Sequence, residues 1–181
     1  AQHWSREDNE QDATALAEML RKLAEIPQMT EALVQGAAMG GGAGLVAACD
    51  VAVAVKGTKF KFSEVRLGLT PATISPFVIN AIGPRWAKAL FVTAEGFDAA
   101  YAEKIGLVQY VVDDFEGLAT MEEHIASLAM GAAPGAIRDA KNLVLDFTGE
   151  PFSATLSKET AKRIAARRVS DEGKEGLSAF L

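Results

Sequence analysis

The chain has 181 residues, a formal net charge of −6, 49% apolar residues and 23% charged residues. This composition is typical of a globular domain with a real core, and the negative charge disfavours nucleic acid or an anionic membrane as a partner. The only cysteine, Cys49, excludes an internal disulfide and suits a reducing compartment, and no run of about eighteen apolar residues predicts a membrane span. We therefore expect a cytoplasmic protein.

After a polar opening segment, apolar residues recur at helical spacing. They are Leu16, Met19, Leu20 and Leu23. This i, i+3, i+4, i+7 pattern predicts a helix that starts near Asp12 and ends before Pro27. Two short apolar runs, 32–35 and 51–55, predict buried strands of a sheet that is covered on both faces.

Between these two runs lie three consecutive glycines, Gly40, Gly41 and Gly42, and a stretch of small residues that predicts a helix over 42–49. Without a β-carbon, the backbone can take a positive φ there and approach a ligand closely. The first amides of the helix lack partners within it and lie at the positive end of its dipole. The segment therefore predicts an amide pocket for an anion or a developing oxyanion. A single carboxylate, Glu64, stands at the far end of the same stretch.

Two phosphate-binding motifs fit these glycines badly. Residues 42–47 match the loose dinucleotide pattern GxGxx(G/A), but the preceding strand is expected to end near Gln35, and the next run ends at Lys56 instead of an acid. A P-loop is excluded because no Gly-Lys-Ser/Thr follows the glycines. Another interpretation stays open, in which the glycines only let a helix pack closely on a sheet.

The second half of the chain is predominantly helical in pattern. Helices are predicted over 73–82, from Pro84 onward, and over 99–104, 121–130, 134–145, 152–168 and 172–181, with a strand over 107–112. Asp98 is expected to cap the helix at Ala99 and Gly106 to end it, and Thr120 with Glu123 predicts a second cap. His3 and His124, the two histidines, lie apart without ligand spacing, so no metal site is predicted.

Three segments of the chain together resemble the crotonase superfamily, the enoyl-CoA hydratases and isomerases. They are QGAAMGGGAGLVAACD (35–50), FSEVRLGLTPATISPFVINAIG (62–83) and VTAEGFDAAYAEKIGLV (92–108). The resemblance extends from about Asp12 to Leu181 and implies an α/β fold. We expect a partial ββα spiral core over 1–112 and a C-terminal helical oligomerisation region over 113–181. Within the second segment, SEVRLGLTPATISPFV (63–78) most resembles the methylglutaconyl-CoA and carboxygeranoyl-CoA hydratases of leucine and isoprenoid breakdown.

The resemblance implies a role for individual residues. Gly41 matches the glycine whose amide forms half of the oxyanion hole for the thioester carbonyl of an acyl-CoA. Glu64 matches the carboxylate that exchanges a proton with the carbon next to that carbonyl. Further substrate-binding positions are expected at Met39, Gly40, Gly44, Pro71 and Ala72. No metal or separate cofactor is implied, because coenzyme A is part of the substrate.

The chain departs from the family pattern at two places. Gly44 stands where two-carboxylate hydratases have a second glutamate, which leaves the water-activating base unidentified. The pattern also places strands and an Ala-Gly-Ala-Asp turn, which supplies the other oxyanion amide, ahead of residue 12. Because the sequence contains no such turn, we expect the N-terminal part of the spiral core to be missing.

From these features we predict a lyase, an enoyl-CoA hydratase of fatty acid or leucine metabolism that acts as a homotrimer or hexamer. Two alternatives stay open: an isomerase that uses Glu64 alone, and a non-catalytic acyl-CoA binding subunit. Basic residues of the C-terminal region are candidate contacts for the phosphates of CoA. They are Lys141, Lys158, Lys162, Arg163, Arg167 and Arg168.

Overall fold

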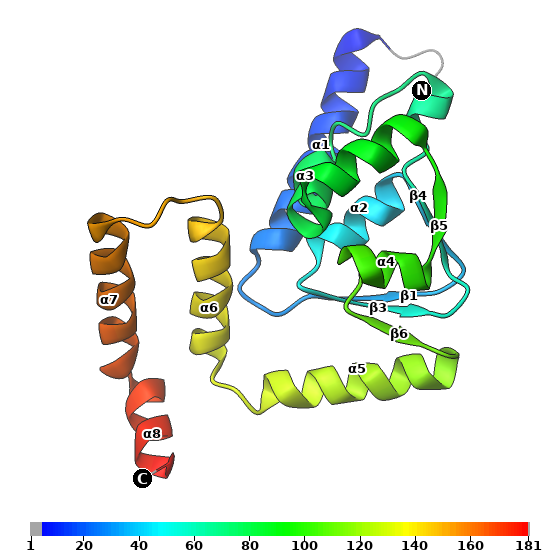
Figure 1. Ribbon diagram of the computed structural model, residues 1–181. Helices are drawn as coiled ribbons and strands as arrows, with labels where there is room; N and C mark the ends of the chain where they lie inside the picture. Colours follow the sequence, from blue (N-terminus) through cyan, green and yellow to red (C-terminus); the bar gives the residue numbers. More distant parts are fainter. Residues whose placement is uncertain (1–4, 181) are drawn as a thin grey trace. The chain divides into compact units, whose positions relative to one another are not determined.

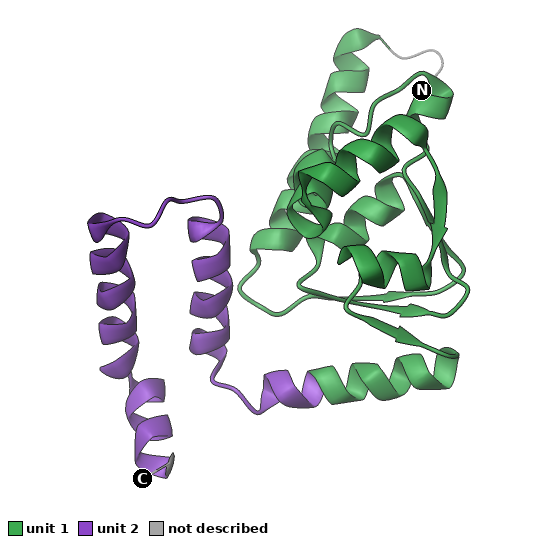
Figure 2. Cartoon of the chain, viewed as in Figure 1, with its two compact units in different colours: residues 1–125 green, residues 126–181 purple. Residues whose placement is uncertain are grey.

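The computed structural model describes residues 5–180 of the chain. These residues divide into two compact units, unit 1 up to Ile125 and unit 2 from Ala126 onward, which have different colours in Figure 2. The division expected from the sequence, after residue 112, falls between the last strand and the helix that follows it. His3 and Leu181 lie outside the described residues.

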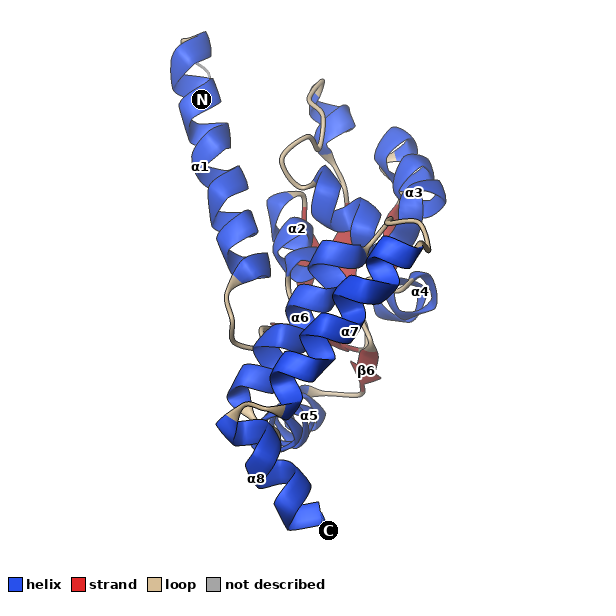
Figure 3. Ribbon diagram, turned by 90° about the vertical axis from the view of Figure 1, so that its left-hand side faces the viewer, coloured by secondary structure: helices blue, strands red, loops and turns tan. Residues whose placement is uncertain are grey.

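The described elements form a mixed α/β architecture, as the sequence predicts. The strands are β1 Glu31–Val34, β2 Ala37–Met39, β3 Val51–Val55, β4 Lys59–Lys61, β5 Gly96–Asp98 and β6 Tyr110–Val112. The helices are α1 Arg6–Glu25, α2 Gly41–Ala48, α3 Ser75–Thr93, α4 Ala99–Ile105, α5 Phe115–Met130, α6 Pro134–Phe147, α7 Ala154–Arg168 and α8 Asp171–Phe180, with a 3-10 helix η1 at Glu64–Leu67. Within residues 5–180 every strand belongs to unit 1. The strands are red in Figure 3.

Unit 1 holds two sheets of three strands each within the described residues. One has the order β1-β3-β6 and is parallel throughout, and the other has the order β2-β4-β5, with β4 antiparallel to β5. Along β3, Ala52 and Ala54 join a core that includes residues of α2, α3 and α4, whereas Val53 joins Leu118 and Ile125 of α5. Because side chains alternate along a strand, the parallel sheet is covered on both faces, which confirms the expectation from its apolar sequence.

A pair of polar side chains joins the starts of β1 and β3. The backbone N–H and the hydroxyl of Thr30 donate to Asp50 Oδ2 at 2.8 and 3.0 Å. The N–H of Asp50 donates to Thr30 Oγ1 at 3.0 Å. Glu31 and Val51, the next residues, are partners in the parallel register.

Several predicted helix boundaries are confirmed. Gly83 has φ 75° and ψ 160° and interrupts α3 between two helical segments, as the Gly-Pro pair predicts. Asp98 accepts a hydrogen bond from the N–H of Tyr101 at 2.9 Å and caps α4, and Gly106 ends that helix with φ 87°. These residues carry local signals that act within one helical turn.

Two predicted helix starts are wrong. Helix α1 begins at Arg6 and not near Asp12, because Ser5 Oγ accepts from the N–H of Asp8 and the Asp8 carboxylate accepts from the N–H of Ser5. Helix α5 begins at Phe115 and not at Met121. Thr120 lies inside this helix and donates its hydroxyl to the Glu116 carbonyl, so it is no cap.

The strands β2 and β5 were not expected from the sequence. The expected end of the first strand near Gln35 is confirmed, because β1 ends at Val34, but the unexpected strand β2 follows it, ends at Met39 and runs directly into Gly40. The dinucleotide motif still fails, because Gly42 lies inside α2 instead of in the turn before it.

Candidate active site

The site begins where β2 turns into α2 at Gly40. This residue has φ 50° and ψ −117°, a conformation that favours glycine. Its N–H donates to the carbonyl of Lys61 in β4 at 2.9 Å, which continues the pairing of β2 with β4 through the turn. This hydrogen bond therefore attaches the turn to β4, the strand that precedes Glu64 in the sequence.

The first amides of α2 have no partner within residues 5–180. Among the residues that the structure describes, no hydrogen-bond acceptor is found for the N–H groups of Gly41 and Gly42. The first amide that bonds back is that of Gly44, to the Gly40 carbonyl at 3.1 Å. A β-carbon built on Gly41 or Gly42 would meet no atom within 4 Å, so the start of the helix faces open space. Two donors are thus available there at the positive end of a helix dipole.

Glu64 lies against this turn. It is the first residue of η1, and its Oε1 is 3.1 Å from the position that a β-carbon on Gly40 would occupy. Its Oε2 is buried and has no hydrogen-bond partner among the described residues. A carboxylate oxygen that is removed from water without a partner is costly, which makes this oxygen a candidate contact for a ligand. Arg66, two residues on, instead donates to the carbonyl of Thr93 at 3.4 Å.

Packing leaves no room for a side chain at position 44, where two-carboxylate hydratases have their second glutamate. Gly44 is buried, and a β-carbon there would lie 2.7 Å from Cβ of Ile74 and closer still to its Cγ2. Ile74, the residue before α3, is 1% exposed. The sequence analysis did not identify Ile74, because a contact between residues thirty positions apart leaves no periodic or motif signal.

The remaining predicted binding residues, Met39, Pro71 and Ala72, differ in exposure and in their distance along the chain from the glycine turn. Met39, at the end of β2, is 44% exposed directly before the glycine turn. Pro71 is buried, and Ala72 accepts hydrogen bonds at its carbonyl from the N–H and the hydroxyl of Ser75, where α3 begins. Thus the structure brings Gly40 and Glu64 into contact, whereas Pro71 and Ala72 lie in the segment before α3, shortly before the Ile74 that Gly44 faces.

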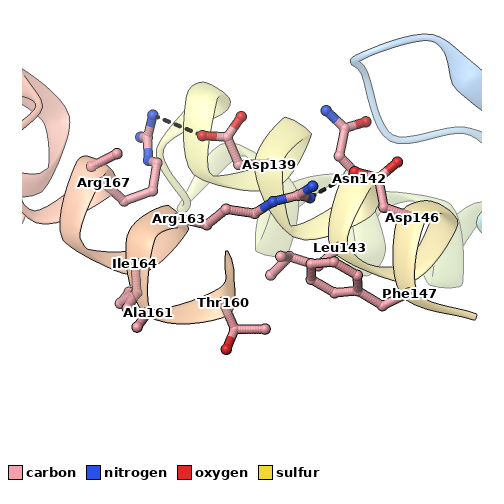
Figure 4. A pocket seen from close by; sticks show the side chains of 11 residues that line it. Asp139, Asn142, Leu143, Asp146, Phe147, Thr160, Ala161, Arg163, Ile164 and Arg167 are labelled. Atoms are coloured by element: carbon pink, nitrogen blue, oxygen red, sulfur yellow. Dashed lines mark hydrogen bonds and ion pairs between the residues drawn. The ribbon is translucent and has the colours of Figure 1, made fainter. Parts of the chain in front are cut away.

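A separate cavity of about 760 Å³ lies within unit 2, between α6 and α7. Figure 4 shows the apolar side chains of Leu143, Phe147 and Ile164 on its wall, together with Arg163 and Arg167. Of the residues predicted to act in substrate binding or catalysis, only Arg163 and Arg167, candidate contacts for the CoA phosphates, line this cavity.

Two arginines of the predicted basic face are already matched by acids. Arg163 pairs with Asp146 at 2.6 Å and with Glu159 at 2.9 Å, and it lies over the Phe147 ring at 4.5 Å.

Arg167 pairs with Asp139 at 3.3 Å and also with Glu172. The N–H of Gly135, followed by the guanidinium of Arg167, holds the pKa of the Glu172 carboxyl below its usual range. Because their charges are matched within the unit, these two arginines are weaker candidates for phosphate contacts than the sequence suggested.

Comparison with known proteins supports the same fold and indicates a family. Residues 2–181 match the family Enoyl-CoA hydratase/isomerase. A solved crotonase-type protein from Legionella pneumophila is 46% identical with a TM-score of 0.92, over 98% of this chain and 68% of that one. An enoyl-CoA hydratase from Shewanella pealeana is 37% identical with a TM-score of 0.92, over 98% and 66%.

The chain is shorter than its curated relatives. The enoyl-CoA hydratase AFT6-1 of Alternaria alternata is 35% identical over 130 residues, which are 72% of this chain and 44% of that protein. A short-chain-enoyl-CoA hydratase of Clostridium acetobutylicum is 31% identical over 88% of this chain and 65% of its own length. The chain thus spans between about half and two thirds of these two relatives.

Proposed function

This chain belongs to the enoyl-CoA hydratase/isomerase family, and from that premise we propose that it adds water across the 2,3 double bond of a 2-enoyl-CoA. The proposal depends most on one observation. One carboxylate oxygen of Glu64, Oε1, lies against a glycine turn whose following amides are open, and its other oxygen, Oε2, is buried without a partner among the described residues.

In this proposal, Gly41 stabilises the charge that develops on the substrate. When water adds to carbon 3 of a 2-enoyl thioester, the electrons of the double bond move toward the carbonyl and its oxygen becomes enolate-like. An amide aimed at that oxygen lowers the barrier, and one such donor is commonly worth about 3 kcal/mol. The open N–H of Gly41, at the first position of α2, can supply it without distorting the helix.

Glu64 is the proposed acid–base group. Its carboxyl can transfer a proton at carbon 2, the atom next to the carbonyl held by Gly41. Burial against Gly40 fixes the side chain and excludes water from one of its oxygens, which favours proton exchange with a bound substrate over exchange with solvent.

The test measures thioester absorbance with the full chain and a short 2-enoyl-CoA. Water addition removes the conjugated double bond, so absorbance should fall. Glu64→Gln should reduce turnover at least ~100-fold and leave CoA binding nearly intact, as expected for the loss of a general acid. The control is Glu103→Gln, which makes the same change at an exposed position of α4. Equal activity of the two variants would contradict the assignment of Glu64.

A second candidate is isomerisation of a 3-enoyl-CoA to the 2-enoyl form. The blocked position at Gly44 favours it, because a double-bond shift needs one carboxylate to move one proton. With a 3-enoyl substrate, absorbance would rise instead of fall. If neither thioester is consumed while CoA still binds, the chain is a non-catalytic acyl-CoA binder.

We also propose finer features of this function. The resemblance of residues 62–83 supports a branched 2-enoyl group of the methylglutaconyl kind, which a comparison of kcat/KM for crotonyl-CoA and 3-methylglutaconyl-CoA tests. The proposed enzyme is cytoplasmic and assembles as a homotrimer or hexamer, and light scattering tests the number of subunits.

The proposed reaction needs no metal, so turnover should persist in EDTA. Among residues 5–180, each helix is either too short or too polar to form a membrane span.

A further inference from the structure

Gly40, the residue before α2, and Gly44, inside that helix, lie about one helical turn apart. The N–H of Gly44 donates to the Gly40 carbonyl at 3.1 Å, which fixes this relation. Gly40 faces the carboxylate of Glu64, and Gly44 faces Ile74. Since one helical turn rises about 5.4 Å, these two contacts, one with the carboxylate and one with the isoleucine, are made about one turn apart along α2.

Ile74 leaves no room for a side chain at position 44. Rotating its side chain would move Cγ2 away from a β-carbon on Gly44, but Cβ of Ile74 would stay 2.7 Å from it. Ile74 is also packed in the main core of unit 1, where it is 1% exposed. It can therefore move aside only by disturbing its other neighbours.

We propose that Ile74 is a specificity-determining residue: by filling the space beside Gly44 it limits this site to one carboxylate, so that Glu64 carries every proton transfer at the acyl chain. This inference rests on the proposed function, because it concerns the same substrate and the same acid–base group. Ile74 itself touches no reacting atom in this proposal and acts by excluding a second acid.

Glu64 alone can accept and return every proton that hydration or isomerisation requires. In hydration, the Glu64 carboxylate takes a proton from water, the hydroxide oxygen bonds to carbon 3, and the double-bond electrons form the thioester enolate. Protonated Glu64 then gives its proton to carbon 2, which restores the carboxylate. In isomerisation, Glu64 takes the proton from carbon 2 of the 3-enoyl group and returns it to carbon 4. A site with one carboxylate can therefore catalyse both reactions.

A thermal-unfolding cycle tests the packing part of the inference without any need for turnover. Gly44→Ala should lower Tm, although alanine is the better helix former. The matched control is Gly42→Ala in the same helix, where an added β-carbon meets nothing within 4 Å, and its Tm should stay the same or rise. Ile74→Gly removes the blocking Cβ, so Gly44→Ala should cost less Tm in that background than in the parent. Equal costs in both backgrounds would overturn the inference.

A product-ratio experiment tests the chemical part. The double variant Gly44→Glu/Ile74→Gly gains a second carboxylate, and Gly44→Gln/Ile74→Gly has nearly the same shape without the charge. With matched 2-enoyl and 3-enoyl thioesters, the glutamate variant should have a ratio of hydration to isomerisation about tenfold or more above the glutamine variant. A merely structural role of Ile74 would leave this ratio equal in the two.

The two experiments separate the possible failures. If the parent chain consumes neither thioester, the proposed function fails, and the control of chemistry by Ile74 fails with it. If the parent is active but the Tm costs are additive, or the ratio is equal in the two double variants, only the inference about Ile74 fails.

Discussion

The two units of this chain are stabilised in different ways. In unit 1, side chains such as Leu20, Phe60 and Val78 are fully buried in one continuous core. In unit 2, α6 and α7 contain no buried residue within the described part of the chain, and ion pairs such as Arg163 with Asp146 join their helices. The residues proposed for chemistry all lie in unit 1, where packing fixes their positions. Single core substitutions should therefore harm unit 1, whereas unit 2 should respond to charge, pH and salt.

The largest expected effect compares one phenylalanine from each unit. Phe60 is 0% exposed and stacks on Phe97, with ring centroids 5.7 Å apart, whereas Phe152 is 102% exposed. Phe60→Ala should destabilise the protein by about 3–5 kcal/mol, and Phe152→Ala by no more than about 0.5 kcal/mol. Chemical denaturation of both variants measures the difference. Similar losses would show that Phe152 is buried in the protein in solution.

The next effect concerns Gly41, the proposed oxyanion donor. Gly41→Pro removes the N–H at the first helical position, where proline is well tolerated, and should reduce turnover by about 10²–10³-fold. Gly41→Ala keeps the N–H and adds a β-carbon that meets nothing within 4 Å, so its loss should be much smaller. Steady-state kinetics on both variants separates the donor from the added bulk. Normal turnover in the proline variant would exclude Gly41 from the oxyanion site.

A smaller effect is expected in unit 2 at Glu172. Its carboxylate accepts from the N–H of Gly135 at 3.0 Å and pairs with Arg167, and these partners lower its pKa. A lowered pKa contributes stability that is present above the ordinary value near 4.5 and is lost as the pH falls through the folded value. Glu172→Gln should therefore lower Tm at pH 7 on the order of 2 °C, and less at pH 3 or in 1 M salt. A difference in Tm that does not change with pH would rule out the charge as its cause.

The smallest expected effect is at Glu31 in unit 1, where the pKa is raised, whereas that of Glu172 is lowered. Burial, followed by the nearby charge of Glu122, raises the pKa of Glu31 above its ordinary value, and its Oε1 is buried without a partner among the described residues. A raised pKa favours the protonated carboxyl in the folded state, so stability falls as the pH rises from the ordinary value through the folded one. Glu31→Gln should raise Tm at pH 8 on the order of 1 °C and leave it unchanged at pH 3. Melting curves at both pH values test this.

The sequence predicted the parts of the fold that local chemistry determines. The runs at 32–35 and 51–55 gave β1 and β3 because a strand buried on both faces is apolar throughout. The caps at Asp98 and Gly106 were found because they act on amides and carbonyls of the adjacent helical turn. The glycine turn and the acid at Glu64 were located from residue types alone, and their catalytic roles stay predictions.

The missed elements are short or depend on distant contacts. β2 and β5 have three residues each, too few for a period-two pattern to be recognised. The start of α1 had a local signal, Ser5 followed three residues later by Asp8, but the absence of apolar residues nearby concealed it. The contact of Gly44 in α2 with Ile74, the residue before α3, depends on the tertiary fold, so no motif could indicate it.

The mutual hydrogen bonds of Thr30 and Asp50 have a consequence for changes in chain length. They bring together the two ends of the segment that contains β1, β2 and α2, directly before the paired residues Glu31 and Val51. An insertion between them must loop outward, since lengthening the strand or the helix would shift this register. The hydrogen bonds between Thr30 and Asp50 therefore fix the number of residues that the segment can hold without a bulge. If residues 30–50 were grafted into another parallel sheet, these bonds would set the same register between the two strands there.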